Sequence, residues 1–367
     1  MKKLLLATAI AALSVSAANA APTLYGKAFV TTDYVSTDLD VQAIDFPFER
    51  IENDNDSLQV NSNLSRIGLR GSEAVTANTD AVYQLEFNVD VDGDRGEAFV
   101  SRDTYLGLKN AQYGEFRFGR NYSVTDYVLD NVTVTKGYWD NLGSSSLNGG
   151  TVAESLTLTD GGRINNSIMW FAPKYNGLPL ELVLQYGADE SFSDDGKAGY
   201  GASLNFNPGT GFAAGVALDS DMSIDGDILR GTASADLSKY IAMPVTMGLL
   251  YQQADYDGSD EDEKGLVVSA KMGLTNFARP AAVYAQYNKT DSLSGLSGND
   301  SDQFVVGGQY FFKDNMIAHA YAGYNSADLD NDTFIVRSQD TDDNDIAVRA
   351  RGDASVLAVG AGLEYIF

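Results

Sequence analysis

The sequence predicts an all-β protein: a closed antiparallel transmembrane β-barrel of about sixteen strands. Two observations favour this fold class. The chain begins with an export signal, and its last segment, residues 356–367, alternates strictly between apolar and small or polar side chains before it ends on Phe367. A strand with one apolar and one polar face separates lipid from water, as the strands of an outer-membrane barrel do.

Residues 1–20 have the form of a cleavable signal peptide. Lys2 and Lys3 precede an apolar stretch that ends in Ala18-Asn19-Ala20, a small-x-small cleavage site. Cleavage there would leave residues 21–367 as a single barrel domain. No later stretch reaches the roughly 18 uninterrupted apolar residues that a membrane-spanning helix needs, so any membrane span must consist of strands.

The composition suits many strands and excludes one class of partner. The chain has 36 Gly, 20 Tyr and 17 Phe but only 7 Pro, a balance typical of twisted strands joined by tight turns. Its formal net charge is -26, and nucleic acid is not expected as a partner because its binding requires a basic patch. Cys is absent, so the exported chain must be stable without disulfides.

Period-two alternation recurs along the whole chain. In residues 81–89, for example, Tyr83, Leu85 and Phe87 share one face, while Gln84 and Glu86 share the other. Short links alternate with long acidic ones, as in outer-membrane barrels, and an even number of strands brings both termini to the periplasmic side. The expected strands are 24–33, 60–71, 80–90, 98–109, 114–121, 163–172, 178–188, 198–207, 211–220, 228–237, 244–255, 265–274, 280–290, 302–312, 316–326 and 354–367.

One connection, residues 122–162, is far longer than a usual loop. It has a helix-compatible start at 124–134 and a Gly/Ser-rich middle at 143–150. A barrel of about sixteen strands encloses a water-filled lumen that side chains cannot fill. We therefore expect this third loop to fold inward and to set the size limit of the hole.

Five motifs and the C-terminal residue, in the right order, resemble the general diffusion porins of Gram-negative outer membranes. They are LYGKA at 24–28, SRIGL at 65–69, YLGLK at 105–109, GEFRFGRNY at 114–122, RINNS at 163–167, and the terminal Phe367. The resemblance implies a homotrimer of sixteen-stranded barrels in the cell outer membrane. It also implies passive diffusion of ions and small hydrophilic solutes, with outer-membrane lipid and lipopolysaccharide as surroundings.

The resemblance implies basic wall residues that face acids on the third loop. Matched by motif, the basic side of the constriction is formed by Lys27, Arg66, Arg102 and Arg163. The alternation of the second expected strand, residues 60–71, supports the position of Arg66 on the basic side. Ile67 and Leu69 share the lipid face, so Arg66 points inward. A charge on the lipid face would cost about 2–4 kcal/mol. The alternative is that these are ordinary solvated charges of the lumen.

The acidic side departs from the family pattern, because the usual Pro-Glu-Phe-Gly-Gly stretch is missing after Tyr122. The candidates for the acidic loop are Asp126, Asp130, Asp140 and Glu154. The first two stand four residues apart and would share one face of a helical turn. The alternative is that all four are solvent-exposed loop acids. The overall acidity favours cations and the basic cluster favours anions, so the ion preference stays open.

The expected mechanism requires no catalytic group, no cofactor and no metal. The only histidine, His319, has neither a Gly-x-Ser-x-Gly motif nor a metal-type His/Cys cluster beside it, and a structural role is expected. Spaced aspartates in the acidic loops lack the Gly and Glu of an EF-hand, although they could bridge to lipopolysaccharide through divalent ions. The alternative function is a surface receptor or adhesin whose long acidic loops, such as 36–57 and 327–353, bind a partner.

Overall fold

The computed structural model describes residues 21–44, 50–93, 98–130, 132–140, 142–143, 151–175, 177–189, 197–337 and 345–367. The expected signal peptide, residues 1–20, lies outside the described residues. The few helical turns in the described part of the chain are all too short or too polar to span a membrane.

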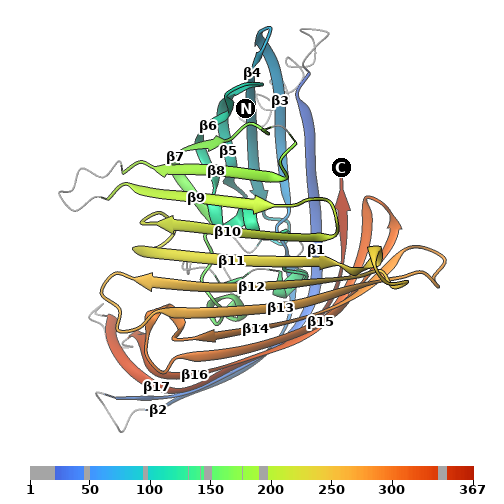
Figure 1. Ribbon diagram of the computed structural model, residues 1–367. Coiled ribbons are helices and arrows are strands. Elements are labelled where there is room, and N and C mark those ends of the chain that lie inside the picture. The colour runs from blue at the N-terminus through green and yellow to red at the C-terminus, as the bar shows by residue number, and fades with distance from the viewer. Residues whose placement is uncertain are drawn as a thin grey trace, which may run out of the picture.

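Antiparallel strands make up almost the whole molecule (Figure 1). Their bounds are β1 (Thr23–Ala43), β2 (Arg50–Ser62), β3 (Arg66–Thr76), β4 (Thr79–Val89), β5 (Phe99–Asn110), β6 (Gly114–Tyr122), β7 (Arg163–Phe171), β8 (Leu180–Gly187), β9 (Gly199–Phe206), β10 (Phe212–Ser220), β11 (Gly226–Asp236), β12 (Val245–Tyr256), β13 (Glu263–Leu274), β14 (Ala281–Asp291), β15 (Asp300–Lys313), β16 (Met316–Arg337) and β17 (Asp345–Ile366). The short helices are η1 (Val124–Val128), η2 (Gly137–Trp139), α2 (Val152–Ser155), η3 (Leu237–Lys239) and η4 (Leu293–Gly295).

The sheet closes on itself because β1 pairs with β17 along residues 27–43. The other edge of β1 is shared, since β2 pairs with its upper part and β3 pairs with its first residues, 23–27. The 17 strands therefore occupy sixteen positions around the barrel, with β2 and β3 in one of them. The structure confirms the predicted closed antiparallel barrel.

The break between β2 and β3 reverses the inward and outward faces of this strand position. Leu64 adopts a left-handed conformation with φ of 51°, and the Ser65 hydroxyl accepts a hydrogen bond from the Phe29 amide at 3.0 Å. Asn61 bonds to the inward Asp33 before the break, whereas Arg66 lies opposite Lys27 after it. Odd-numbered side chains thus face inward in β2 and even-numbered ones in β3, which places Arg66 in the lumen.

Two segments expected as long loops are strands, and that expectation was wrong. Within 36–57, β1 and β2 extend as a hairpin to Ala43 and from Arg50, and within 327–353, β16 and β17 extend to Arg337 and from Asp345. The physical reason is that these strands rise above the lipid, where the outward face meets water. On the β1–β2 hairpin, the outward side chains include Asp38, Asp40, Asp54 and Asp56, which hide the alternation that marks a strand between lipid and water.

The two faces of the barrel differ as the C-terminal alternation predicts. Leu357, Val359 and Leu363 on β17 are between 41% and 50% exposed, whereas Val356 and Ala358 are buried. Comparable exposed apolar side chains recur on strands around the barrel. This outer surface suits contact with lipid, and the buried inner positions indicate that other chain segments cover part of the inner wall.

Candidate functional site

We call the segment between β6 and β7, residues 123–162, the inner loop. Its described parts, residues 123–130, 132–140, 142–143 and 151–162, lie inside the barrel. Inward-facing side chains of the wall bond to its backbone at points spread over its length. The Gln185 and Gln286 side chains accept hydrogen bonds from the Val124 and Val134 amides at 3.1 and 2.8 Å. The wall residues Thr232, Gln252 and Asn325 donate to carbonyl oxygens of the loop. These bonds satisfy backbone groups that would otherwise be buried without partners.

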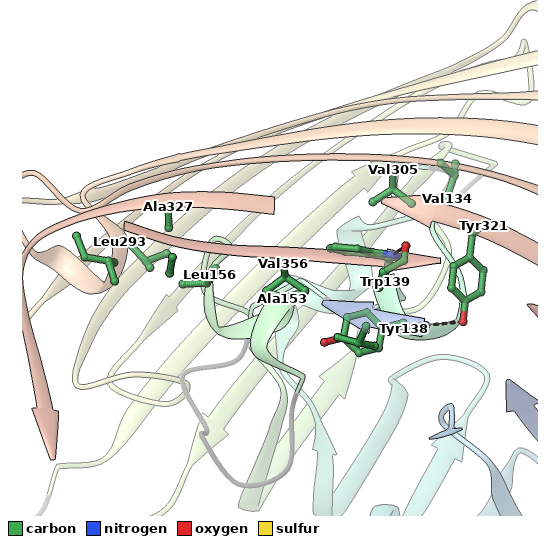
Figure 2. Packing of buried hydrophobic residues seen from close by; sticks show 14 of the residues in the cluster. Val134, Tyr138, Trp139, Ala153, Leu156, Leu293, Val305, Tyr321, Ala327 and Val356 are labelled. Carbon is green, nitrogen blue, oxygen red and sulfur yellow. Dashed lines mark hydrogen bonds between the residues drawn. The ribbon is translucent and has the colours of Figure 1, made fainter. Parts of the chain in front are cut away.

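The tip of the inner loop is held in a slot on β16 and β17 (Figure 2). Trp139 is almost fully buried, and its indole nitrogen donates a hydrogen bond to the Ala358 carbonyl at 3.3 Å. The indole lies over Gly323, where a Cβ atom would come within 2.6 Å of the ring. The glycine is therefore what leaves room for the tryptophan.

A chain of hydrogen bonds fixes the same tip to β1. The Tyr138 amide donates to the Tyr321 hydroxyl at 3.0 Å, shown as a dashed line in Figure 2, and Tyr321 donates to Asp33 at 2.6 Å. The Asp33 carboxylate is fully buried and also accepts from Asn61 and Thr31. The tip is thus tied by side chains from β1, β2 and β16, so its position relative to the wall is well defined.

A cavity of about 150 Å³ separates the inner loop from the wall, and residues from both sides line it. Arg102 and Arg163 are the basic residues of its lining, and Asp126, Asp140 and Asp160 are the acidic ones. The remaining lining residues are Leu64, Tyr122, Leu129, Thr133, Thr135, Leu142 and Gly162. The structure thus brings together two of the four predicted basic residues and two of the four predicted acids.

The basic wall carries its own acids. Glu86 on β4 lies between Arg102, at 2.8 Å, and Arg66, at 3.7 Å, and it accepts a hydrogen bond from the Tyr25 hydroxyl at 3.0 Å. Arg102 also donates to the Tyr122 hydroxyl at 3.2 Å. Because one carboxylate faces two guanidinium groups, this part of the wall keeps a positive charge, but a smaller one than its arginines alone would give.

The other two predicted basic residues are also paired. Arg163 contacts Asp103 at 3.0 Å, and its guanidinium lies over the Tyr122 ring at 3.9 Å. Lys27 contacts Glu364 at 3.4 Å and does not line the cavity. The same glutamate contacts the buried ring of His319 at 3.0 Å, which gives the only histidine a structural position on the wall.

The predicted acids lie in different surroundings. Asp140 pairs with Lys136 at 2.8 Å on the loop itself. Glu154 accepts a hydrogen bond from the Thr151 amide at 3.0 Å in the capping box that begins α2, so it stabilises a helix end. Asp130 is exposed and lies outside the 150 Å³ cavity. Because η1 ends at Val128, Asp126 and Asp130 do not share one face of a helix as expected.

Asp126 on the inner loop has one carboxylate oxygen that is fully buried. Its Oδ2 atom is inaccessible to solvent and has no hydrogen-bond partner. Burial raises the pKa of Asp126 well above its usual range, and repulsion from Asp160 adds to the rise, while Arg230 and Arg163 oppose it. The neutral form of this carboxyl is therefore favoured far more than in an ordinary aspartate.

Three charged residues of the site were missed in the sequence. Asp160 lines the cavity and contacts the fully buried Arg230 at 3.2 Å, but nothing in its neighbourhood marks it as special. Asp103 is missed for the same reason. Glu86 could have been predicted, because the alternation of residues 81–89 already places its side chain on the lumen face of the strand.

A closed barrel with lipid-type side chains outside and a charged cavity between its wall and an inner loop defines a membrane channel. Comparison with known proteins agrees. The sequence profile described as Gram-negative porin matches residues 7–332. Outer membrane protein F of Serratia marcescens is 26% identical, and the match spans 100% of both chains. An anion-selective porin from Comamonas acidovorans, 18% identical, superposes with a TM-score of 0.64 over 95% of this chain and 100% of the other.

A second similar structure is OmpT of Vibrio cholerae in a trimer form, 16% identical, with a TM-score of 0.54 over 95% of this chain and 99% of the other. The chain belongs to the Gram-negative porin family. It lies in the outer membrane and forms a water-filled channel for the passive diffusion of ions and small hydrophilic solutes. The matching family profile is described as a Gram-negative porin, which does not favour the receptor or adhesin alternative.

Proposed function

We propose that the constriction of this channel is the gap between the inner loop and the wall of β5–β7. Arg102 and Arg163 form its basic side, and Asp126, Asp140 and Asp160 form its acidic side. The observation that carries the proposal is the cavity that all five residues line. Arg66 supports the basic side through Glu86, and Lys27, Asp130 and Glu154 are not part of the constriction.

The proposed mechanism is passive. Opposite charges on the two sides of a narrow aqueous gap produce a transverse field, which the low-dielectric protein around the gap focuses. Small polar solutes align in this field, whereas a large apolar solute would have to displace ordered water without compensation. Screening acts over about 8 Å at physiological salt, so charges at the outer ends of the strands should affect selectivity less than those in the gap. No catalytic step is proposed.

The proposed assembly is a homotrimer of mature chains, residues 21–367, in lipid and lipopolysaccharide. The trimeric form of the similar Vibrio cholerae structure and the apolar outer surface of the barrel support it. Native mass spectrometry of the protein extracted from membranes should give three copies per particle and the mass of a chain cleaved after Ala20. A monomeric particle, or a chain that keeps its first residues, would contradict this assembly.

The constriction is tested by neutralising its basic side. Arg102→Gln should shift the reversal potential in a planar bilayer under a salt gradient toward cation preference, because it removes one positive charge from the gap. The matched control is Arg50→Gln, which removes the same charge from an exposed ion pair on the outer hairpin. An unchanged reversal potential in Arg102→Gln, or an equal shift in both variants, would place the constriction elsewhere.

A further inference from the structure

An apolar groove lies on the outer, lipid-facing surface of the barrel, and we call it the outer groove. Its volume is about 580 Å³. Ala233 and Ala235 of β11 form its floor, between the neighbouring strands β10 and β12 (Figure 1). Larger apolar side chains that are exposed on the outer surface form its sides, namely Phe206, Phe212, Met247, Leu249 and Val268. The outer groove is therefore a hollow over β11 in the apolar surface of the barrel.

The pairing of the strands explains the depth and direction of the outer groove. Ala235 lies opposite Phe212 on one side and Met247 on the other, so a small side chain stands between two large ones. Above the groove, Gly231 continues the row of small residues on β11, and Leu229, which is 52% exposed, ends it. This row is about 20 Å long at roughly 3.4 Å per residue. On a strand tilted by about 40°, it descends through about 15 Å, which is half of a hydrocarbon core about 30 Å thick.

The periplasmic mouth of the outer groove is formed by the turn between β11 and β12, which folds back over the link between β9 and β10. The Tyr240 ring packs against the Phe212 ring at 5.3 Å, and its hydroxyl donates a hydrogen bond to the Thr210 carbonyl at 2.7 Å. Lys239 is exposed, and its Nζ atom donates to the Gly209 carbonyl at 2.6 Å. An ammonium group has three protons, so two remain for an acceptor outside the protein.

The positive charge of Lys239 makes the mouth complementary to an anion. Asp236, the nearest acid along the chain, accepts hydrogen bonds from the Ser238 amide and hydroxyl at 3.1 and 2.5 Å and thereby caps η3. The chain as a whole has a net charge of -26, so an anion can be held only beside a local cation. Basic side chains at a membrane surface attract anionic lipid headgroups. A groove one leaflet deep with a cation at its mouth thus matches an acyl chain that ends in a phosphate.

We propose that the outer groove binds a glycerophospholipid of the periplasmic leaflet that carries a net negative charge. One acyl chain lies over Ala233 and Ala235, and the phosphate accepts a hydrogen bond from the Nζ atom of Lys239. The mouth opens at the periplasmic end of the barrel, so the lipid belongs to that leaflet. This site lies outside the lumen, and it does not depend on where the constriction is.

Titration of the detergent-extracted protein with phosphatidylglycerol, followed by native mass spectrometry, tests the acyl part of the site. Ala233→Leu should weaken the apparent affinity about tenfold, because the larger side chain fills the floor and displaces methylene groups of the lipid. The matched control is Ala285→Leu on β14. Ala285 lies outside the outer groove but at the same height as Ala235, since the register runs from Ala235 through Met247 and Ala270 to Ala285. The control should keep the affinity of the wild type.

The headgroup is tested by Lys239→Gln, with neutral diacylglycerol of the same chain length as the second probe. The substitution should weaken phosphatidylglycerol binding about fivefold and leave diacylglycerol binding unchanged, because only the phosphate contacts the lysine. Lys313→Gln, at an exposed periplasmic lysine outside the groove, is the control for net charge.

Three results would overturn the lipid site. The first is an affinity for phosphatidylglycerol that is unchanged in Ala233→Leu or in Lys239→Gln. The second is equal weakening in either variant and its control. The third is a change in the number of chains per particle in Ala233→Leu, which would assign the outer groove to a contact between subunits. Weaker lipid binding in both variants, with both controls unchanged, supports the site even if the constriction lies elsewhere.

Discussion

Glu86 shows how much the charge of the gap depends on a single wall residue. Its side chain lies against Arg66, Arg102 and Tyr25 and is almost fully buried. Without it, two guanidinium groups would face each other across one strand, and the buried Arg102 left without its partner would cost about 1–3 kcal/mol. The acid therefore makes a cluster of arginines stable in the wall while it reduces the positive charge that a passing ion meets.

Asp126 should give the channel a pH-dependent selectivity. Because burial raises its pKa, this carboxyl takes up a proton at a higher pH than an ordinary aspartate does. As the pH falls from about 9 to about 4, the gap should lose the negative charge of Asp126 at a higher pH than an ordinary aspartate would, and the reversal potential should then move toward anion preference. The measurement is the reversal potential under a fixed salt gradient across this range.

The control for this titration is Asp126→Asn, which should lack the change in reversal potential that the Asp126 carboxyl causes. The raised pKa of Asp126 also affects the free energy of unfolding. The ionised carboxyl destabilises the fold at high pH, and its protonation removes this cost as the pH falls. A titration that is the same in the wild type and in Asp126→Asn would show that another group is responsible.

The inner loop illustrates why local sequence did not determine local structure. Residues 124–134 are compatible with a helix, but the structure has a single 3-10 turn, η1, that ends at Val128. The Val128 and Val132 carbonyl oxygens accept hydrogen bonds from wall hydroxyls, and the Val134 amide donates to a wall glutamine. These contacts replace the bonds of a continuing helix, and no local pattern could have predicted them.

The slot for Trp139 provides a test of how the loop is held. Gly323→Ala should displace the indole, because the new Cβ would come within 2.6 Å of it, and should lower the free energy of unfolding by about 1–3 kcal/mol. The expected signs are a red-shifted tryptophan fluorescence and a noisier open-channel current. Gly308→Ala on the neighbouring strand is the control, since its Cβ would meet no atom closer than 3.5 Å. Identical spectra for both variants would mean that the slot does not hold the loop.

At the scale of the whole molecule, the sequence was sufficient to predict the barrel. Period-two alternation between lipid and water is repeated in enough strands to require closure, and the chain ends meet where the Gly26 and Phe367 backbones exchange two hydrogen bonds of 2.9 and 3.0 Å. Alternation does not fix the register between strands, so the partners of the wall arginines were beyond prediction. The reversal of faces at Leu64 was missed because it depends on which strands pair with β1. The long hairpins were missed because their upper parts lie above the lipid, where the alternation is lost.

The central claim is that the inner loop and the charged wall enclose the narrowest part of the water path. Because the chain has no Cys, Asp140→Cys provides a unique thiol in the cavity lining, and Asp314→Cys provides one on an exposed periplasmic turn. A bulky water-soluble thiol reagent added to open single channels should lower the conductance in discrete steps in Asp140→Cys and leave it unchanged in Asp314→Cys. Unchanged conductance in an Asp140→Cys channel whose modification is proven by mass spectrometry would contradict the claim.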